Sequence, residues 1–75
     1  MTPLSPDEIR TIANREGVNT NAVERFLRDM KPEVSLEDHL KSLAYEIKIY
    51  HYNKQTKAAM RNGIMLAYRL RGDVQ

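Results

Sequence analysis

The chain has no cysteine among its 75 residues, so neither a disulfide nor a zinc site built on thiolates can stabilise it. A chain of this length forms one domain, residues 1–75, and buries only a modest core. Its stability therefore has to come from tight helix packing or from self-association. The absence of cysteine is also compatible with a cytoplasmic location.

Long apolar runs are missing as well. The longest one covers residues 64–68, whereas a membrane-spanning helix needs about 20 apolar residues. The first ten residues, MTPLSPDEIR, lack the basic start and apolar centre of a signal peptide. We therefore expect a cytoplasmic protein without a membrane partner.

The net charge of +2 is small, but it is unevenly distributed. Residues 1–30 contain four basic and five acidic side chains, and residues 31–53 contain three and four. Residues 54–75 contain five basic side chains and one acidic one, so the positive charge lies in the C-terminal part of the chain.

Two short helices are expected within residues 5–30. Ser5 and Glu8 have the spacing of a capping box, and Gly17 suits the left-handed residue that closes a helix. Asn19 is a good cap for the second helix, which Lys31 and Pro32 should end. The expected buried faces, at helical spacing, are Ile9, Ile12 and Ala13, then Ala22, Val23, Phe26, Leu27 and Met30.

Two longer helices are expected within residues 35–71, which makes the domain an all-α bundle of four helices. The third opens at Ser35. Its residues 45–52 also alternate between apolar and polar side chains, as a strand does. The helical periodicity that begins at Leu36 is longer, so it favours a helix. The fourth should cover about residues 55–70, with Gly63 as a close-packing point and Gly72 as its end. The expected buried faces are Leu36, Leu40, Leu43, Ala44, Ile47 and Tyr50, then Met60, Ile64, Ala67 and Leu70.

A short first helix, a turn containing glycine and a second helix fixed from beneath are the elements of a helix-turn-helix. Ala13, Gly17 and Val23 have the spacing of the small residue, the glycine and the branched residue in that motif. Residues 9–28 therefore resemble the helix-turn-helix of small bacterial and phage regulators. Glu16 departs from the pattern, because that family usually has a small or apolar residue there.

The resemblance implies a DNA-binding protein with a regulatory, phage or plasmid role, in which residues 20–30 enter the major groove. Asparagine and arginine suit base recognition, and basic residues of the fourth helix would contact phosphates. A polar helix face that is merely solvated is the alternative. The implied DNA-binding residues are Asn19, Thr20, Asn21, Glu24, Arg25, Arg28, Lys54, Lys57 and Arg61.

The same N-terminal residues also resemble the first two helices of a ubiquitin-associated-like domain. That resemblance implies a protein-interaction module with an apolar patch near Gly17 and Val18, and no nucleic acid. A positive rim around the second helix would favour DNA, and an exposed apolar patch there would favour a protein partner.

No other pattern indicates chemistry. His39 and His51 do not share a helix face, so no metal site is expected, and no triad or phosphate loop is present. We expect neither an enzyme nor a cofactor. Residues 71–73 spell Arg-Gly-Asp, which we interpret as a helix terminus.

Apolar residues exceed what one small domain can cover. The third helix has a second apolar face, formed by Tyr45, Ile49 and Tyr52. The fourth helix is apolar on nearly every side over residues 64–68. This surplus predicts a homodimer formed through residues 36–70.

Overall fold

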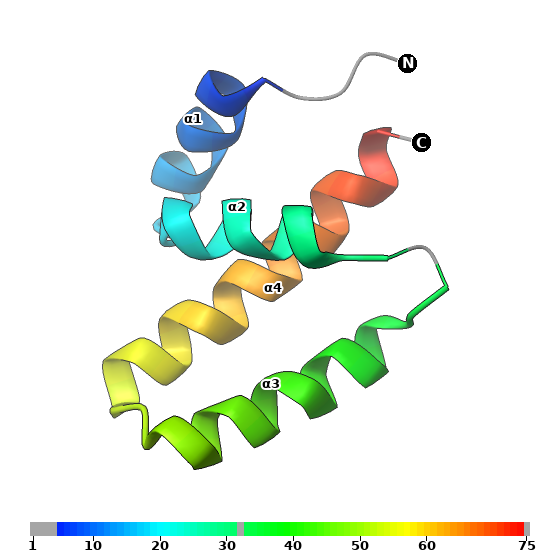
Figure 1. Ribbon diagram of the computed structural model, residues 1–75. Helices are drawn as coiled ribbons and strands as arrows, with labels where there is room; N and C mark the ends of the chain where they lie inside the picture. The colour runs from blue at the N-terminus through cyan, green and yellow to red at the C-terminus, as the bar shows by residue number, and fades with distance from the viewer. Residues whose placement is uncertain (1–4, 32, 75) are drawn as a thin grey trace.

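The computed structural model describes residues 5–31 and 33–74, with the main chain alone for residues 72–74. The fold is all-α, as predicted: these residues form four helices and no strand (Figure 1). The helices are α1 (Pro6–Glu16), α2 (Thr20–Asp29), α3 (Leu36–Tyr50) and α4 (Lys54–Val74).

Helix α4 is the element on which the others are arranged. Helix α2 crosses it near its middle, while α1 packs against α2, and α3 returns beside α4 at one edge of the molecule (Figure 1). The principal-axis extents are 37 × 28 × 14 Å, so the molecule is flat. A thickness of 14 Å is about what two crossing helices need, because packed helix axes lie roughly 8–10 Å apart.

The crossing of α2 and α4 depends on Gly63, as the sequence predicted. A Cβ atom added at Gly63 would lie 2.6 Å from the Cβ of Ala22 and 3.2 Å from the carbonyl carbon of Ala22. No real Cβ atom tolerates the shorter distance. The missing side chain thus lets the two helix backbones come together, and the central glycine of α4 is a packing residue rather than a turn.

The core gathers around this crossing. Ile64 and Val23 are the largest fully buried side chains, and they come from α4 and α2. Helix α1 contributes only Ala13 to the fully buried set, and α3 contributes only Leu43. The buried hydrophobic residues are Ala13, Ala22, Val23, Phe26, Met30, Leu43, Ile64, Leu66, Ala67 and Leu70.

Local chemistry sets the helix boundaries. The backbone N–H of Glu8 donates to Ser5 Oγ at 3.2 Å, and the backbone N–H of Ser5 donates to Glu8 Oε1 at 3.3 Å, which confirms the capping box. Ser35 caps α3 through a single hydrogen bond, its Oγ accepting from the N–H of Asp38 at 3.2 Å. Helix α2 ends at Asp29, with Met30 already extended. The predicted stop at Pro32 lies outside the described residues.

The helix predicted in preference to a strand at residues 45–52 is confirmed, because α3 continues to Tyr50 and His51 closes it with a φ of 53°. One predicted boundary was wrong. Helix α4 begins at Lys54 and continues to Val74, so Gly72 does not end it. One glycine costs a helix only about 1 kcal/mol, which the rest of a 21-residue helix can offset.

The predicted buried face of α3 was too wide. Leu43 is buried, and Leu36, Leu40 and Ile47 are half-buried, but Ala44 is exposed and Tyr50 is 68% exposed. The physical reason is the flatness of the molecule, since α3 meets its neighbours along one narrow strip only.

We predict that Gly63→Ala destabilises the protein by about 1–3 kcal/mol, the usual cost of overpacking. On an uncrowded helix the same change would be stabilising by roughly 1 kcal/mol. Urea unfolding followed by circular dichroism measures the effect. Ala22→Gly removes the atom that the new methyl group would meet, so the double variant should recover part of the loss. Stability equal to the parent's in Gly63→Ala would contradict the proposed packing role.

Candidate nucleic-acid interface

The turn between α1 and α2 is closed by backbone hydrogen bonds. Gly17 has a φ of 70°, in the left-handed region that favours glycine, and its N–H donates to carbonyl groups of the last turn of α1. The N–H of Val18 donates to Ala13 O at 2.8 Å. The side chain of Asn19 accepts a hydrogen bond of 3.0 Å from the N–H of Ala22, which starts α2. The two helices therefore have a well-defined junction.

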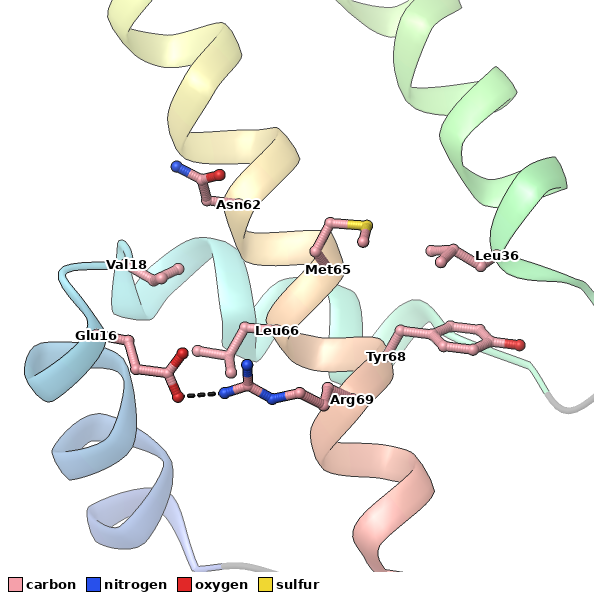
Figure 2. Close-up of a pocket in the computed structure, with 8 residues that line it drawn as sticks. All are labelled: Glu16, Val18, Leu36, Asn62, Met65, Leu66, Tyr68 and Arg69. Atoms are coloured by element: carbon pink, nitrogen blue, oxygen red, sulfur yellow. Dashed lines mark hydrogen bonds and ion pairs between the residues drawn. The ribbon is translucent and has the colours of Figure 1, made fainter.

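Glu16, which departs from the helix-turn-helix pattern, has a partner in α4. Its carboxylate forms an ion pair with Arg69 (Figure 2). A charged residue is therefore accommodated before Gly17 because it reaches across to α4 instead of packing under the turn.

The outer face of α2 carries little free positive charge. Asn21 and Arg28 are exposed, while Thr20 and Glu24 are half-buried. The Nε atom of Arg28 lies 3.5 Å from a carboxylate oxygen of Asp29. Asn19 already uses its side-chain oxygen as a cap, so few of the predicted recognition residues remain available.

Arg25 is committed to an interaction within the protein. Its guanidinium donates two hydrogen bonds to the Glu46 carboxylate, at 2.8 and 2.5 Å. The Tyr52 hydroxyl donates to the same carboxylate at 2.7 Å, and the guanidinium lies 5.1 Å from the centre of the Phe26 ring. These contacts join α2 to α3 and to the segment that leads into α4. Arg25 is therefore not free to reach a base.

The charges of this network stabilise one another. The hydrogen bonds from Arg25 lower the pKa of the Glu46 carboxyl, against the opposing effect of burial, and the Tyr52 hydroxyl adds to the lowering. The hydrogen bond to Glu46 is also the main cause that raises the pKa of Arg25 and that of Tyr52. At neutral pH the network therefore contains an ionised carboxylate, a charged guanidinium and a protonated phenol.

The other predicted basic residues form a surface at the start of α4. Lys54, Lys57 and Arg61 line a shallow depression together with Tyr52 and Ala58. We call these three cations the basic surface. None of them forms an ion pair with a carboxylate of residues 5–31 or 33–71. The first turn of α4 contains no acidic residue.

The structure does not bring the two predicted groups of DNA-binding residues together. Gly63 marks the side of α4 that meets α2. Lys54 and Arg61 are nine and two residues away from it, and at about 100° per residue both turn to the opposite side of α4. Lys57, six residues from Gly63, lies about 120° around the helix. The basic surface therefore faces largely away from the outer face of α2.

Sequence reasoning missed Glu46 and misplaced Tyr52. Tyr52 was expected on a dimerisation face, but it is half-buried and bonded to Glu46. A carboxylate between Tyr45 and Ile47, in a segment of alternating apolar and charged residues, was the available signal that a partner was needed. The partner, Arg25, lies 21 residues away, and no local pattern connects positions that far apart.

Comparisons of the chain with protein-family models, with curated proteins and with solved structures give no match. No helix among the described residues is long and apolar enough to cross a membrane. Within the same part of the chain, no three histidine or acidic side chains gather where they could hold a metal ion. The interpretation of the site therefore rests on its own geometry.

We predict that Glu46→Gln destabilises the protein by about 1–2 kcal/mol at pH 7, between the values typical of exposed and buried ion pairs. The side chains of Arg25 and Glu46 remain 34% and 20% exposed, so solvent screening keeps the cost moderate. Urea unfolding of the parent and the variant measures it. Glu33→Gln, at an exposed position, removes the same charge and should change stability little.

The cost of Glu46→Gln should depend on pH. Because the pKa of Glu46 is lower in the folded protein, the unfolded chain binds more protons as the pH falls, and folding loses this contribution. The contribution is complete above the unfolded pKa of about 4.3 and is lost as the pH falls through the folded value. Parent and variant should therefore converge in acid, and a difference that persists at low pH would contradict the assignment.

Proposed function

We propose that the protein binds DNA and that the basic surface of α4 makes the phosphate contacts. The supporting observation is that Lys54, Lys57 and Arg61 gather on one exposed depression without carboxylate partners among the described residues. Phosphate neutralisation supplies most of the sequence-independent affinity of DNA-binding proteins. These cations are free to provide it.

The position of the cations on α4 supports the same proposal. Lys54 and Lys57 occupy the beginning of the helix, where the positive end of the helix dipole disfavours cations and favours anions. The arrangement is therefore unfavourable for the isolated helix. A bound phosphate would relieve the repulsion. The N–H of Thr56 in the first turn already donates to Asn53 Oδ1 at 2.8 Å, so the phosphate would be held mainly by the side-chain cations.

Three phosphate contacts give a modest affinity. Each neutralised phosphate contributes about −0.9 to the slope of log K against log salt concentration, so a slope of roughly −2.7 is expected. Non-specific affinities of this kind are on the order of 10⁻⁴–10⁻⁶ M at physiological salt. The proposal is therefore one of weak, strongly salt-dependent binding by each copy.

The helix-turn-helix resemblance adds a regulatory role to the proposal, with α2 as the helix that reads bases. The residues still exposed for this task are Asn21 and Arg28. Helix α2 and the basic surface lie on different sides of α4. Base reading by α2 and phosphate binding by α4 should therefore be lost through different mutations.

We predict that Lys54→Gln, Lys57→Gln and Arg61→Gln each weaken binding to all duplexes alike and flatten the salt slope by about 0.9. Fluorescence anisotropy with a labelled duplex, at a series of salt concentrations, measures both effects. Asn21→Ala and Arg28→Ala should leave this general affinity unchanged, because α2 faces away from the basic surface.

Arg15→Gln is the matched control, since it removes one positive charge from an exposed position on α1. Two results would contradict the proposal: no salt-sensitive affinity for any duplex in the parent, or a loss in Arg15→Gln as large as that in Arg61→Gln. A base-specific loss of about 1–3 kcal/mol in Asn21→Ala would instead assign sequence reading to α2.

A groove beside the α1–α2 turn favours a second candidate function, a protein-interaction module. Val18, Leu36, Met65, Leu66 and Tyr68 supply its apolar lining. Figure 2 shows it between the turn, α4 and the start of α3, with the Glu16–Arg69 ion pair at one edge. Met65 is 51% exposed and Tyr68 is 37% exposed. The resemblance to a ubiquitin-associated-like domain implies an apolar patch near this turn.

One titration separates the two functions. With duplex DNA added, the amide NMR signals of residues 54–61 should shift if the basic surface binds it, while those of Val18 and Met65 should not. Unchanged spectra throughout would remove the support for DNA binding and favour the groove as the functional surface.

A further inference from the structure

Two tyrosine rings stack at the turn that joins α3 to α4 (Figure 1). His51 closes α3 in the left-handed conformation, and the N–H of Tyr52 donates to Ile47 O at 3.2 Å. Along a continuing helix, the side chains of residues 50 and 52 would point about 200° apart. The reversal at His51 instead brings the two ring centroids to 6.1 Å, with 19° between the ring planes. That distance is within the range of stacked aromatic pairs.

The two stacked rings differ in their surroundings. Tyr52 is half-buried, and its hydroxyl donates to Glu46 at 2.7 Å, so the position of its ring is fixed. Tyr50 is 68% exposed. One side of the Tyr50 ring is supported by Tyr52, and most of the ring is open to solvent. A flat ligand that stacks on Tyr50 would therefore meet a ring that is already held from behind.

The stacked pair adjoins the basic surface. Tyr52 lines the same shallow depression as the three cations of that surface. Residues 47–72 contain no acidic side chain. Glu46, the acid just before them, has its charge balanced by Arg25. This end of the molecule therefore combines an exposed aromatic ring with cations that form no ion pair with any carboxylate of the described residues.

We propose that this surface binds DNA whose bases are unpaired, with one base stacked on Tyr50 and the adjoining phosphates on the basic surface. The inference rests on the proposed DNA binding and names the form of DNA that the surface prefers. Proteins that bind single strands combine cations along the backbone with aromatic side chains on which bases stack. A duplex presents phosphates but keeps the faces of its bases covered, so it can use the cations and not the ring.

Fluorescence anisotropy of the full chain tests the inference, with a labelled oligothymidine of about 12 nucleotides and a duplex of the same length. The parent should bind the single strand more tightly than the duplex. Tyr50→Ala should weaken single-strand binding about fivefold to a hundredfold, as is typical of losing one stacked base, and should leave duplex binding unchanged. The salt slope should stay the same, because no charge is removed. Tyr50→Phe keeps the ring and should bind as the parent does.

Tyr45→Ala is the matched control. Tyr45 is 67% exposed on the same helix, but it precedes Tyr50 by five residues and points about 140° away from it. Its loss should leave binding to both forms of DNA unchanged. In NMR spectra, the ring protons of Tyr50 should shift upfield when oligothymidine is added, and those of Tyr45 should not. Circular dichroism of each variant should retain the parent's helical signal.

Three results would overturn the inference: equal affinity of the parent for duplex and single strand, parent-like single-strand binding by Tyr50→Ala, or an equal loss in Tyr45→Ala. An oligouridine that binds more tightly than the oligothymidine would overturn the assignment to DNA. The proposed phosphate contacts would survive the first three results if Lys57→Gln and Arg61→Gln still weakened binding to both forms. Absence of salt-sensitive binding to either form would instead remove the proposed function, and the inference with it.

Discussion

The close approach of α2 to α4 is the constraint on which the rest of the structure depends. Gly63 lacks the side chain that would collide with Ala22, so the two backbones meet and the apolar residues around them interdigitate. Such short distances strengthen the dispersion attraction over many atom pairs and bury more apolar surface. Helix α1 then needs only to cover the beginning of α2, and α3 packs beside the crossing.

Two stacked helices make a flat molecule, and a flat molecule leaves apolar and charged side chains outside. Tyr45, Ile49 and Met65 remain exposed because no element is available to cover them. The Arg25–Glu46–Tyr52 network uses polar contacts to fix α3 where apolar burial is sparse. Its link to Tyr52 also holds the segment before Lys54, and so helps to position the basic surface.

Local chemistry made the helices predictable from the sequence. Ser5, Gly17 and Asn19 act within four residues of their own position, and the structure confirms all three caps. Gly63 was predicted as a close-packing point inside the fourth helix, and the structure confirms it. Helical periodicity also places Lys54 and Arg61 on the side of α4 opposite Gly63. The pairing of Arg25 with Glu46 joins positions 21 residues apart, and periodicity carries no information about such a contact.

The dependence of α2 on α4 also has a consequence for synthesis. The apolar stripe of α2 is complete once residue 30 has been made, but the residues that cover it lie between positions 60 and 70. A chain growing from its N-terminus therefore exposes Val23 and Phe26 for the whole interval, and the core cannot close earlier. During that time the nascent chain is open to chaperones and to aggregation, and its folding follows translation of α4.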